Sequence, residues 1–143
     1  MSNAEAQAEV ERLVDRVLPH AEGMLIEHGQ FFPFAGALTL EGEIAELAVG
    51  EEHKHSSVEV VVEALERMLR GAAENFRATA LAFPVEAELP GGQANSDAVA
   101  IALDHRDDFS VVLIIPYVLS EGAVQFGEAV AQQGEHGIFG RRA

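Results

Sequence analysis

The chain has 143 residues, 48% hydrophobic and 23% charged, which is typical of one globular domain spanning 1–143. A net charge of −15 argues against binding to nucleic acid or an anionic membrane, and the absence of cysteine excludes disulfides and thiolate sites. The N-terminus lacks a signal-peptide pattern. The longest apolar run, at 109–119, is well short of the roughly 20 residues that a membrane helix needs. These features predict a cytoplasmic protein.

The first expected element is a helix over residues 4–28. Its apolar stripe consists of Val10, Leu13, Val14, Val17, Leu18, Ala21, Met24 and Leu25, with His28 at the end. Pro19 lacks a backbone donor and predicts a kink or break near Val17 and Leu18, while Gly29 is suited to end the helix. We expect His20 and His28 to be satisfied or partly exposed side chains rather than ligands.

A hairpin and a second helix are expected next. Two alternating runs flank the turn Glu41-Gly42. Their shared faces are Phe32, Phe34, Gly36, Leu38 and Leu40 in the first run, and Ala45, Leu47 and Val49 in the second. The pattern Ser56-Ser57-Val58-Glu59 resembles a capping box and predicts a helix from 57 to about 74. Its buried stripe would be Val58, Val61, Val62, Leu65, Met68, Leu69 and Ala72.

Three strand candidates and a tail complete the chain. The first places Thr79, Leu81, Phe83, Val85, Ala87 and Leu89 on one face, and Pro84 predicts an edge or a bulge there. The second turns Val99, Ile101 and Leu103 inward. The third, 109–119, is apolar on both faces and predicts a central strand covered on both sides. From Ser120 onward the pattern fits either a short helix around 124–133 or a late strand.

The element order α-β-β-α-β-β-β, with a short C-terminal element, predicts an α+β fold in which helices pack on an antiparallel sheet of about five strands. Over most of the chain this order resembles profilin-like folds, especially the roadblock group of small dimerising scaffolds. The resemblance implies the strand order 2-1-5-4-3. The segment FFPF at 31–34 is similar to the start of the first strand in small uncharacterised bacterial proteins, and this similarity implies no activity.

The segment EEHKH, residues 51–55, is the first candidate site. Carboxylate and imidazole are ligands for zinc and similar ions, and His53 and His55 would point the same way in an extended segment. With Glu51 they form a candidate metal site. The alternative is a solvated loop in which Glu51 and Glu52 favour the start of the following helix. We favour the loop and predict no cofactor.

The second candidate is DHRDD, residues 104–108. A histidine between acids can act as a general base, but aspartate is also frequent in turns, and we favour a hairpin turn between two strands. In the roadblock-like order the two clusters lie at opposite ends of the sheet, which argues against one shared active site. The chain contains no nucleophile-elbow, P-loop, zincin or dinucleotide-binding motif.

The sequence therefore favours a non-enzymatic protein-interaction or scaffold module that acts as a homodimer or with another protein. Its two amphipathic helices, its two-faced strand and the exposed-looking aromatics Phe31 and Phe32 exceed what one small sheet can bury, and uncovered apolar surface marks partners. The alternative is a small-molecule or metal-binding protein, including an enzyme, centred on Glu51, His53 and His55.

Overall fold

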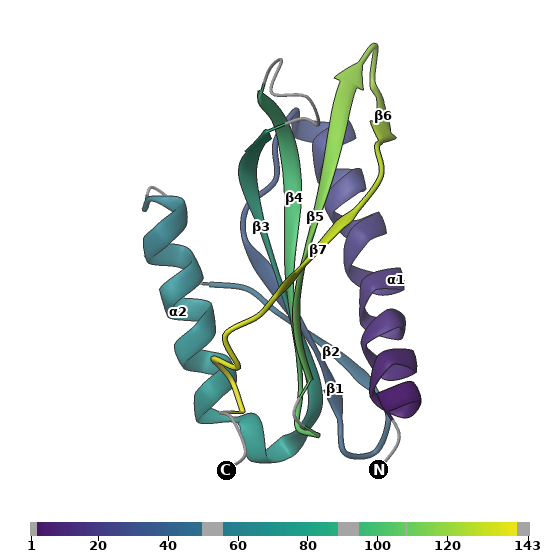
Figure 1. Cartoon of the computed structure of the whole chain (residues 1–143). Coiled ribbons are helices and arrows are strands. Elements are labelled where there is room, and N and C mark those ends of the chain that lie inside the picture. Colours follow the sequence, from purple (N-terminus) through teal and green to yellow (C-terminus); the bar gives the residue numbers. More distant parts are fainter. Residues whose placement is uncertain (1–2, 50–55, 89–94, 108, 140–143) are drawn as a thin grey trace.

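The computed structural model describes residues 3–49, 56–88, 95–107 and 109–139. Two helices pack on a curved antiparallel sheet (Figure 1). The elements are α1 (Asn3–His28), β1 (Phe34–Thr39), β2 (Ile44–Leu47), α2 (Val58–Gly71), the 3₁₀ turn η2 (Ala73–Asn75), β3 (Phe76–Glu88), β4 (Asn95–His105), β5 (Phe109–Ser120), β6 (Ala123–Phe126) and β7 (Val130–Gln133). The α+β prediction is confirmed, and the C-terminal element consists of two strands.

The strands are arranged in the order β2-β1-β3-β4-β5, and both β6 and β7 pair with β5. The roadblock-like order is therefore wrong, because β3 lies beside β1. The cause is the end of α2, where η2 turns the chain directly back to the sheet. The backbone N–H of Leu40 donates to the Asn75 carbonyl over 3.1 Å, and Phe76 then pairs with Thr39. Strand β3 thus begins next to the end of β1.

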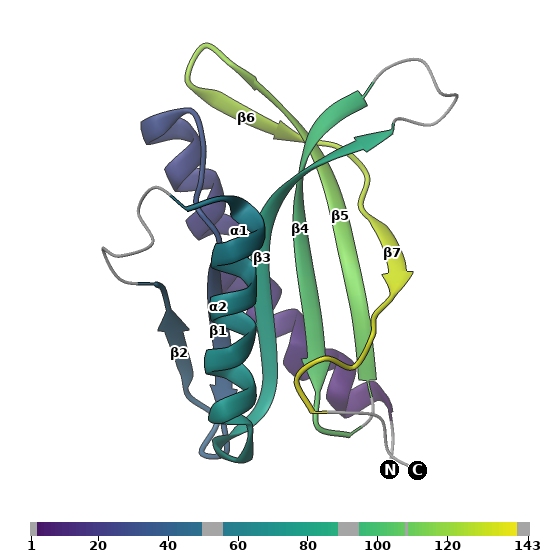
Figure 2. The ribbon, with the colours of Figure 1, turned by 90° about the vertical axis from the view of Figure 1, so that its left-hand side faces the viewer.

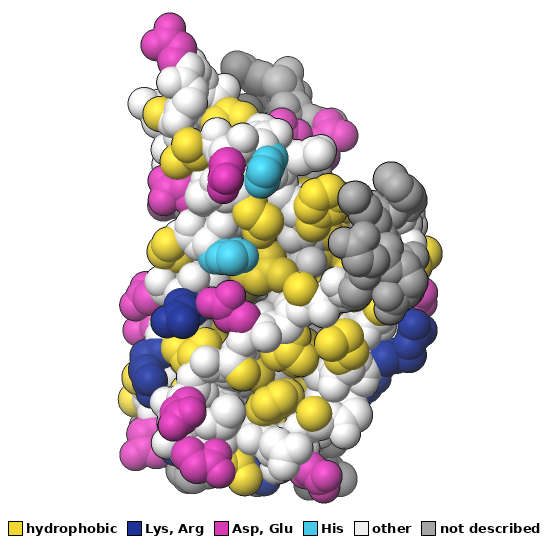
Figure 3. All heavy atoms as spheres, turned by 180° about the vertical axis from the view of Figure 1, so that it is seen from behind, with side chains coloured by type: hydrophobic (Ala, Val, Ile, Leu, Met, Phe, Trp, Pro, Cys, Tyr) yellow, Lys and Arg dark blue, Asp and Glu magenta, His cyan; other side chains and the backbone are white. Residues whose placement is uncertain are grey.

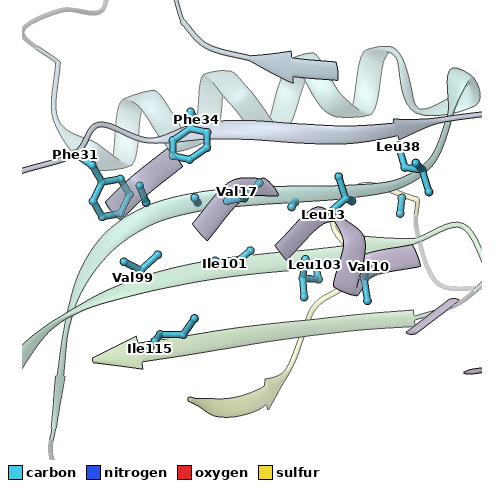
Figure 4. Packing of buried hydrophobic residues seen from close by; sticks show 14 of the residues in the cluster. Val10, Leu13, Val17, Phe31, Phe34, Leu38, Val99, Ile101, Leu103 and Ile115 are labelled. Atoms are coloured by element: carbon cyan, nitrogen blue, oxygen red, sulfur yellow. The ribbon is translucent and has the colours of Figure 1, made fainter. Parts of the chain in front are cut away.

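Helix α1 covers one face of the sheet with its predicted stripe (Figure 4). Leu13 and Val17 pack above Gly36, where a Cβ atom would lie 3.2 Å from Val17 Cγ2. Of the predicted kink or break near Val17 and Leu18, the break is wrong, since the helix continues through Pro19 to His28. Pro19 is exposed, so water can solvate the carbonyl that its ring leaves without a donor. Gly29, at φ 75°, ends the helix as predicted.

The start of β1 separates two aromatics that were expected to be exposed. Phe31 is buried and lies edge-on to Phe34, with ring centroids 6.4 Å apart. Phe32 is 58% exposed, so it does not share the buried face of Phe34. The alternating pattern begins inside the strand, and Phe32 precedes it.

Helix α2 packs on the opposite face, mainly against β3 and β1. Its cap is Ser57, whose Oγ accepts from the Val60 N–H, so the cap lies one residue later than the capping box starting at Ser56. Leu65 and other stripe residues are buried, but Met68 is 41% exposed, contrary to prediction. Figure 2 shows that α2 leaves the same side of β4 and β5 without a helix. We call this side of the sheet the α2 side.

Strand β5 was predicted to be covered on both sides, and the structure does not show this. Ile115 is its one buried residue. Strand β5 lies between β4 on one side and, on the other, β6 and β7, each of which pairs with β5. An edge or a bulge was predicted at Pro84, and the structure shows an edge over only part of β3. Pairing with β1 stops at Phe34 and Ala82, so Pro84 pairs with Val99 of β4 and has no described neighbour strand on its other side. Neither helix in the described part of the chain combines the length and the apolar character that a membrane span requires.

Candidate functional site

The two sequence candidates have different outcomes. Glu51, His53 and His55 lie outside the described residues. The DHRDD segment is a hairpin end, as predicted: β4 runs through His105 and β5 begins at Phe109. Asp104 and His105 are nevertheless buried, which the turn prediction missed. As successive strand residues they point to opposite faces of the sheet.

His105 points to the α1 side and joins the sheet to α1. Its Nδ1 accepts the Asp107 N–H over 3.0 Å, which leaves the proton on Nε2. Nε2 lies 2.7 Å from Glu9 Oε1 and donates to it, while the other Glu9 oxygen lies 2.7 Å from Arg77 Nη2. Because the His105 side chain is only 2% exposed and both ring nitrogens have partners within the chain, it positions α1 and does not face a substrate.

Asp104 points to the α2 side, in a row of polar residues across adjacent strands. It pairs with Thr79 of β3 and with Ser110 of β5. Asp104 accepts a hydrogen bond from Ser110, but its Oδ1 and the Thr79 Oγ1 are buried without a partner among the described residues. Burial raises the pKa of Asp104, while the Ser110 bond and the nearby His136 oppose this rise. The row therefore contains a buried acid, Asp104, and two oxygens, Asp104 Oδ1 and Thr79 Oγ1, that have no hydrogen-bond partner among the described residues.

The row is covered by residues Gly134–Phe139, which we call the tail segment. The Gly134 N–H donates to the Ser110 carbonyl over 3.0 Å, and the His136 N–H donates to Ser110 Oγ over 3.1 Å. On the helix side, Arg70 Nη1 donates to the Gly137 carbonyl over 3.4 Å, and Ile138 is buried in the core beneath α2. The tail segment thus bridges β5 and α2.

A cavity of about 280 Å³ lies between α2, the sheet and the tail segment. Its polar lining residues are Glu66, Asp104, Ser110, Gln132, Gln133 and Glu135, and its apolar walls include Val62, Leu81, Phe83, Val112 and Ile138. We call it the Asp104 cavity. An arrangement of this kind can bind a small molecule.

A groove of about 840 Å³ continues along the α2 side and shares Gln132 with the Asp104 cavity. Its apolar residues include Val85 and Ala87 of β3, Ile114 and Pro116 of β5, and Val130 of β7. By strand alternation Val118 points to the same side. Val118 is 61% exposed and Val130 is 53% exposed. We call these six residues the open face.

A further apolar area covers the sheet edge formed by β2, between α1 and α2 (Figure 3). Charged side chains border this area, and Glu46 pairs with Arg16 over 3.0 Å. His20 and His28 are exposed on α1, and the His20 ring lies edge-on to Phe34 at 4.7 Å. Both match the expectation of partly exposed histidines.

Among the described residues, no group of three or more histidines and acids is placed to hold a metal ion. Comparison with protein-family models, curated proteins and solved structures finds no match for the chain. The fold therefore defines the chain as an α+β protein with helices packed on an antiparallel sheet. The resemblance to roadblock proteins extends no further than a helix followed by such a sheet.

Proposed function

We propose that the chain is a small, cytoplasmic, non-enzymatic protein-interaction module that acts as a homodimer through its open face. The observation that supports this proposal is that α2 does not cover β5. Strand β5 has apolar side chains on both sides, yet α2 covers mainly β1 and β3. Ile114, Pro116 and Val118 are left without a helix. Val118 is exposed, like Val130 on the same face, and exposed apolar side chains grouped on one face mark a partner.

The net charge limits which kind of surface can form the contact between copies. Two chains of net charge −15 repel each other, so the contact must be apolar and poor in acids. The carboxylates that line the open-face groove, Glu86 and Glu128, are exposed and can turn outward. Glu43 and Glu46 lie at the β2 edge and are exposed like the two groove carboxylates, so charge alone does not separate the two surfaces. The open face is favoured because α2 leaves β5 without a helix. Packing of two such sheet faces across a two-fold axis is a common interface geometry.

Sedimentation of dilute protein at several salt concentrations tests the proposal. We expect a dimer whose affinity rises, or does not fall, from low to moderate salt, because charges are screened within about 10 Å at 0.1 M. Val118→Asp should abolish the dimer. Ile26→Asp is the matched control, because Ile26 is 48% exposed but lies on α1, across the sheet.

Three results would contradict the proposal. A monomer under all conditions would leave only a different protein as partner. A dimer that dissociates as salt rises would be held by ion pairs. Equal dimerisation by the Val118→Asp protein would place the interface elsewhere. The alternative function, metal binding by Glu51, His53 and His55, rests on the sequence alone, and elemental analysis of purified protein tests it.

A further inference from the structure

We infer that the tail segment is a strap that lifts from the sheet, and that a second copy of the chain binds the apolar surface beneath it. This inference rests on the proposed homodimer and enlarges its contact, because the surface beneath the tail segment continues the open face.

The two surfaces belong to one trough along β4, in which large side chains of β3 and β5 flank alanines of β4. The strand pairings define three rows, which are Leu81, Ala102 and Val112, then Phe83, Ala100 and Ile114, then Val85, Ala98 and Pro116. Residues two apart on a strand share a side of the sheet, so the rows are continuous. The first row lines the Asp104 cavity, and Val85 and Pro116 line the open-face groove. The tail segment thus covers one end of a surface whose other end is open.

The trough fits the sheet of a second copy. Its walls stand on β3 and β5, two strand spacings or about 9–10 Å apart, which leaves room for one row of side chains from a facing sheet. In a two-fold dimer, a wall of each copy can enter the trough of the other. No residue of the three rows is charged, as contact between two chains of net charge −15 requires. Lifting the strap adds the Leu81 row and buries more apolar area.

The tail segment is fastened by backbone hydrogen bonds and by one large buried side chain. Figure 2 shows this segment, in yellow, crossing β5 near the start of that strand. Its bonds to Ser110 come from the N–H groups of Gly134 and His136, and its bond from Arg70 is long, at 3.4 Å. Ile138 is the buried anchor, and the β7 strand that leads into the segment is exposed at all four residues. Lifting therefore breaks a small, local set of contacts.

The closed strap also carries costs that lifting relieves. His136 has a φ of 56°, in the left-handed region that is unfavourable for a residue with a Cβ atom. Beneath the strap, Asp104 Oδ1 is buried without a partner among the described residues, which costs free energy until water reaches it. Asp104 lies one row beyond Leu81, at the end of the trough. Water can therefore reach the carboxyl group at the rim of the enlarged contact.

Amide hydrogen exchange in the unaltered protein measures the lifting directly. At concentrations where sedimentation shows a monomer, the amides of Gly134 and His136 should be at least about a hundredfold less protected than the Ile101 amide in the centre of β4. When the concentration is raised until the dimer forms, their protection should fall by a further factor of about ten or more. A partner that binds only the lifted state shifts the equilibrium toward it. The protection of Ile101 should not fall.

A variant without the anchor tests the effect on the dimer. Ile138→Ser should raise the dimer affinity at least about tenfold, because the strap no longer has to be lifted before the second copy binds. Ala131→Ser is the matched control, because Ala131 is exposed on β7 and lines a groove beside α1. Its dimer affinity should stay within about threefold of the unaltered protein. The exchange measurement needs no variant, so it does not depend on the Ile138→Ser protein folding.

Different results would overturn this inference and the homodimer. Amides of Gly134 and His136 as protected as that of Ile101 would show that the strap does not lift. Protection that is unchanged or rises when the dimer forms, or an unchanged or lower affinity of the Ile138→Ser dimer, would show that the second copy binds with the strap closed. The open-face dimer would then stand without this extension. A monomer at every concentration would overturn both proposals.

Discussion

Replacing Leu65 with alanine tests how much the α2 layer contributes to stability. Leu65 lies on the buried face of α2 and is completely buried, in the cluster with Leu69 and Leu81. The change removes three carbons, worth about 0.8 kcal/mol each on transfer from water, or roughly 2.4 kcal/mol before the cavity is counted. With the cavity term, we expect a loss of about 2.5–5 kcal/mol in the free energy of unfolding.

Urea unfolding at fixed protein concentration measures this loss as a lower midpoint with an unchanged slope. Met68→Ala is the matched control, because Met68 lies one turn away on the same helix and is 41% exposed. Its cost should stay below about 1 kcal/mol. If Leu65→Ala costs less than about 0.5 kcal/mol, or no more than Met68→Ala, α2 does not bury the stripe that the structure assigns to it.

Two other predictions concern the polar row and the tail segment. Burial raises the pKa of Asp104 in the folded protein above its ordinary value of 3.8, so its protonated form stabilises the fold. That contribution is complete below pH 3.8 and is lost as pH rises through the raised pKa. Urea unfolding from pH 3 to 7 should therefore show Asp104→Asn gaining stability relative to the unaltered protein as pH rises, and a constant or falling difference would refute this. Gly134→Ala should cost about 1–3 kcal/mol, because the new methyl group would overlap Ser110 Oγ and lie 3.0 Å from Ser110 Cβ. Gly137→Ala, whose nearest neighbour would be Glu66 Oε2 at 3.7 Å, should change stability by less than about 0.5 kcal/mol, and equal effects of the two substitutions would contradict the placement of the tail segment.

Local patterns predicted the elements well where one short segment decides the outcome. The start of α2 was predicted to within one residue, because its cap depends on Ser57 and Val60 alone, and the end of α1 was predicted because it depends on Gly29 taking a positive φ. The strand order could not be predicted in this way. It depends on where η2 returns the chain after α2, which no residue in β1 or β3 encodes by itself.

The Asp104 position shows the same limit at the candidate site. Within DHRDD, Asp104 has the composition of a turn residue, and its burial depends on the tail segment folding over it thirty residues later. A usable signal was nevertheless present. The alternation of Ala98, Ala100 and Ala102 continues through Asp104 and assigns it to the same side of the sheet as these alanines, which is the α2 side. Continuing the alternation from Ala102 to Asp104 would have assigned Asp104 to the strand and not to the turn.

The packing of α1 against β4 has a consequence for how the chain is made. Leu13 and Val17 emerge from the ribosome early, whereas Ile101 and Leu103, against which the helix packs, follow Leu13 by about 90 residues. At typical rates of synthesis that interval is roughly 5 to 20 s. During this time α1 can pack only on the strands that have already been made, first β1 and then β3. A nascent chain stopped before β4 therefore leaves the part of the stripe that packs on β4 and β5 open to chaperones that hold apolar segments, and α1 completes its packing only near the end of translation.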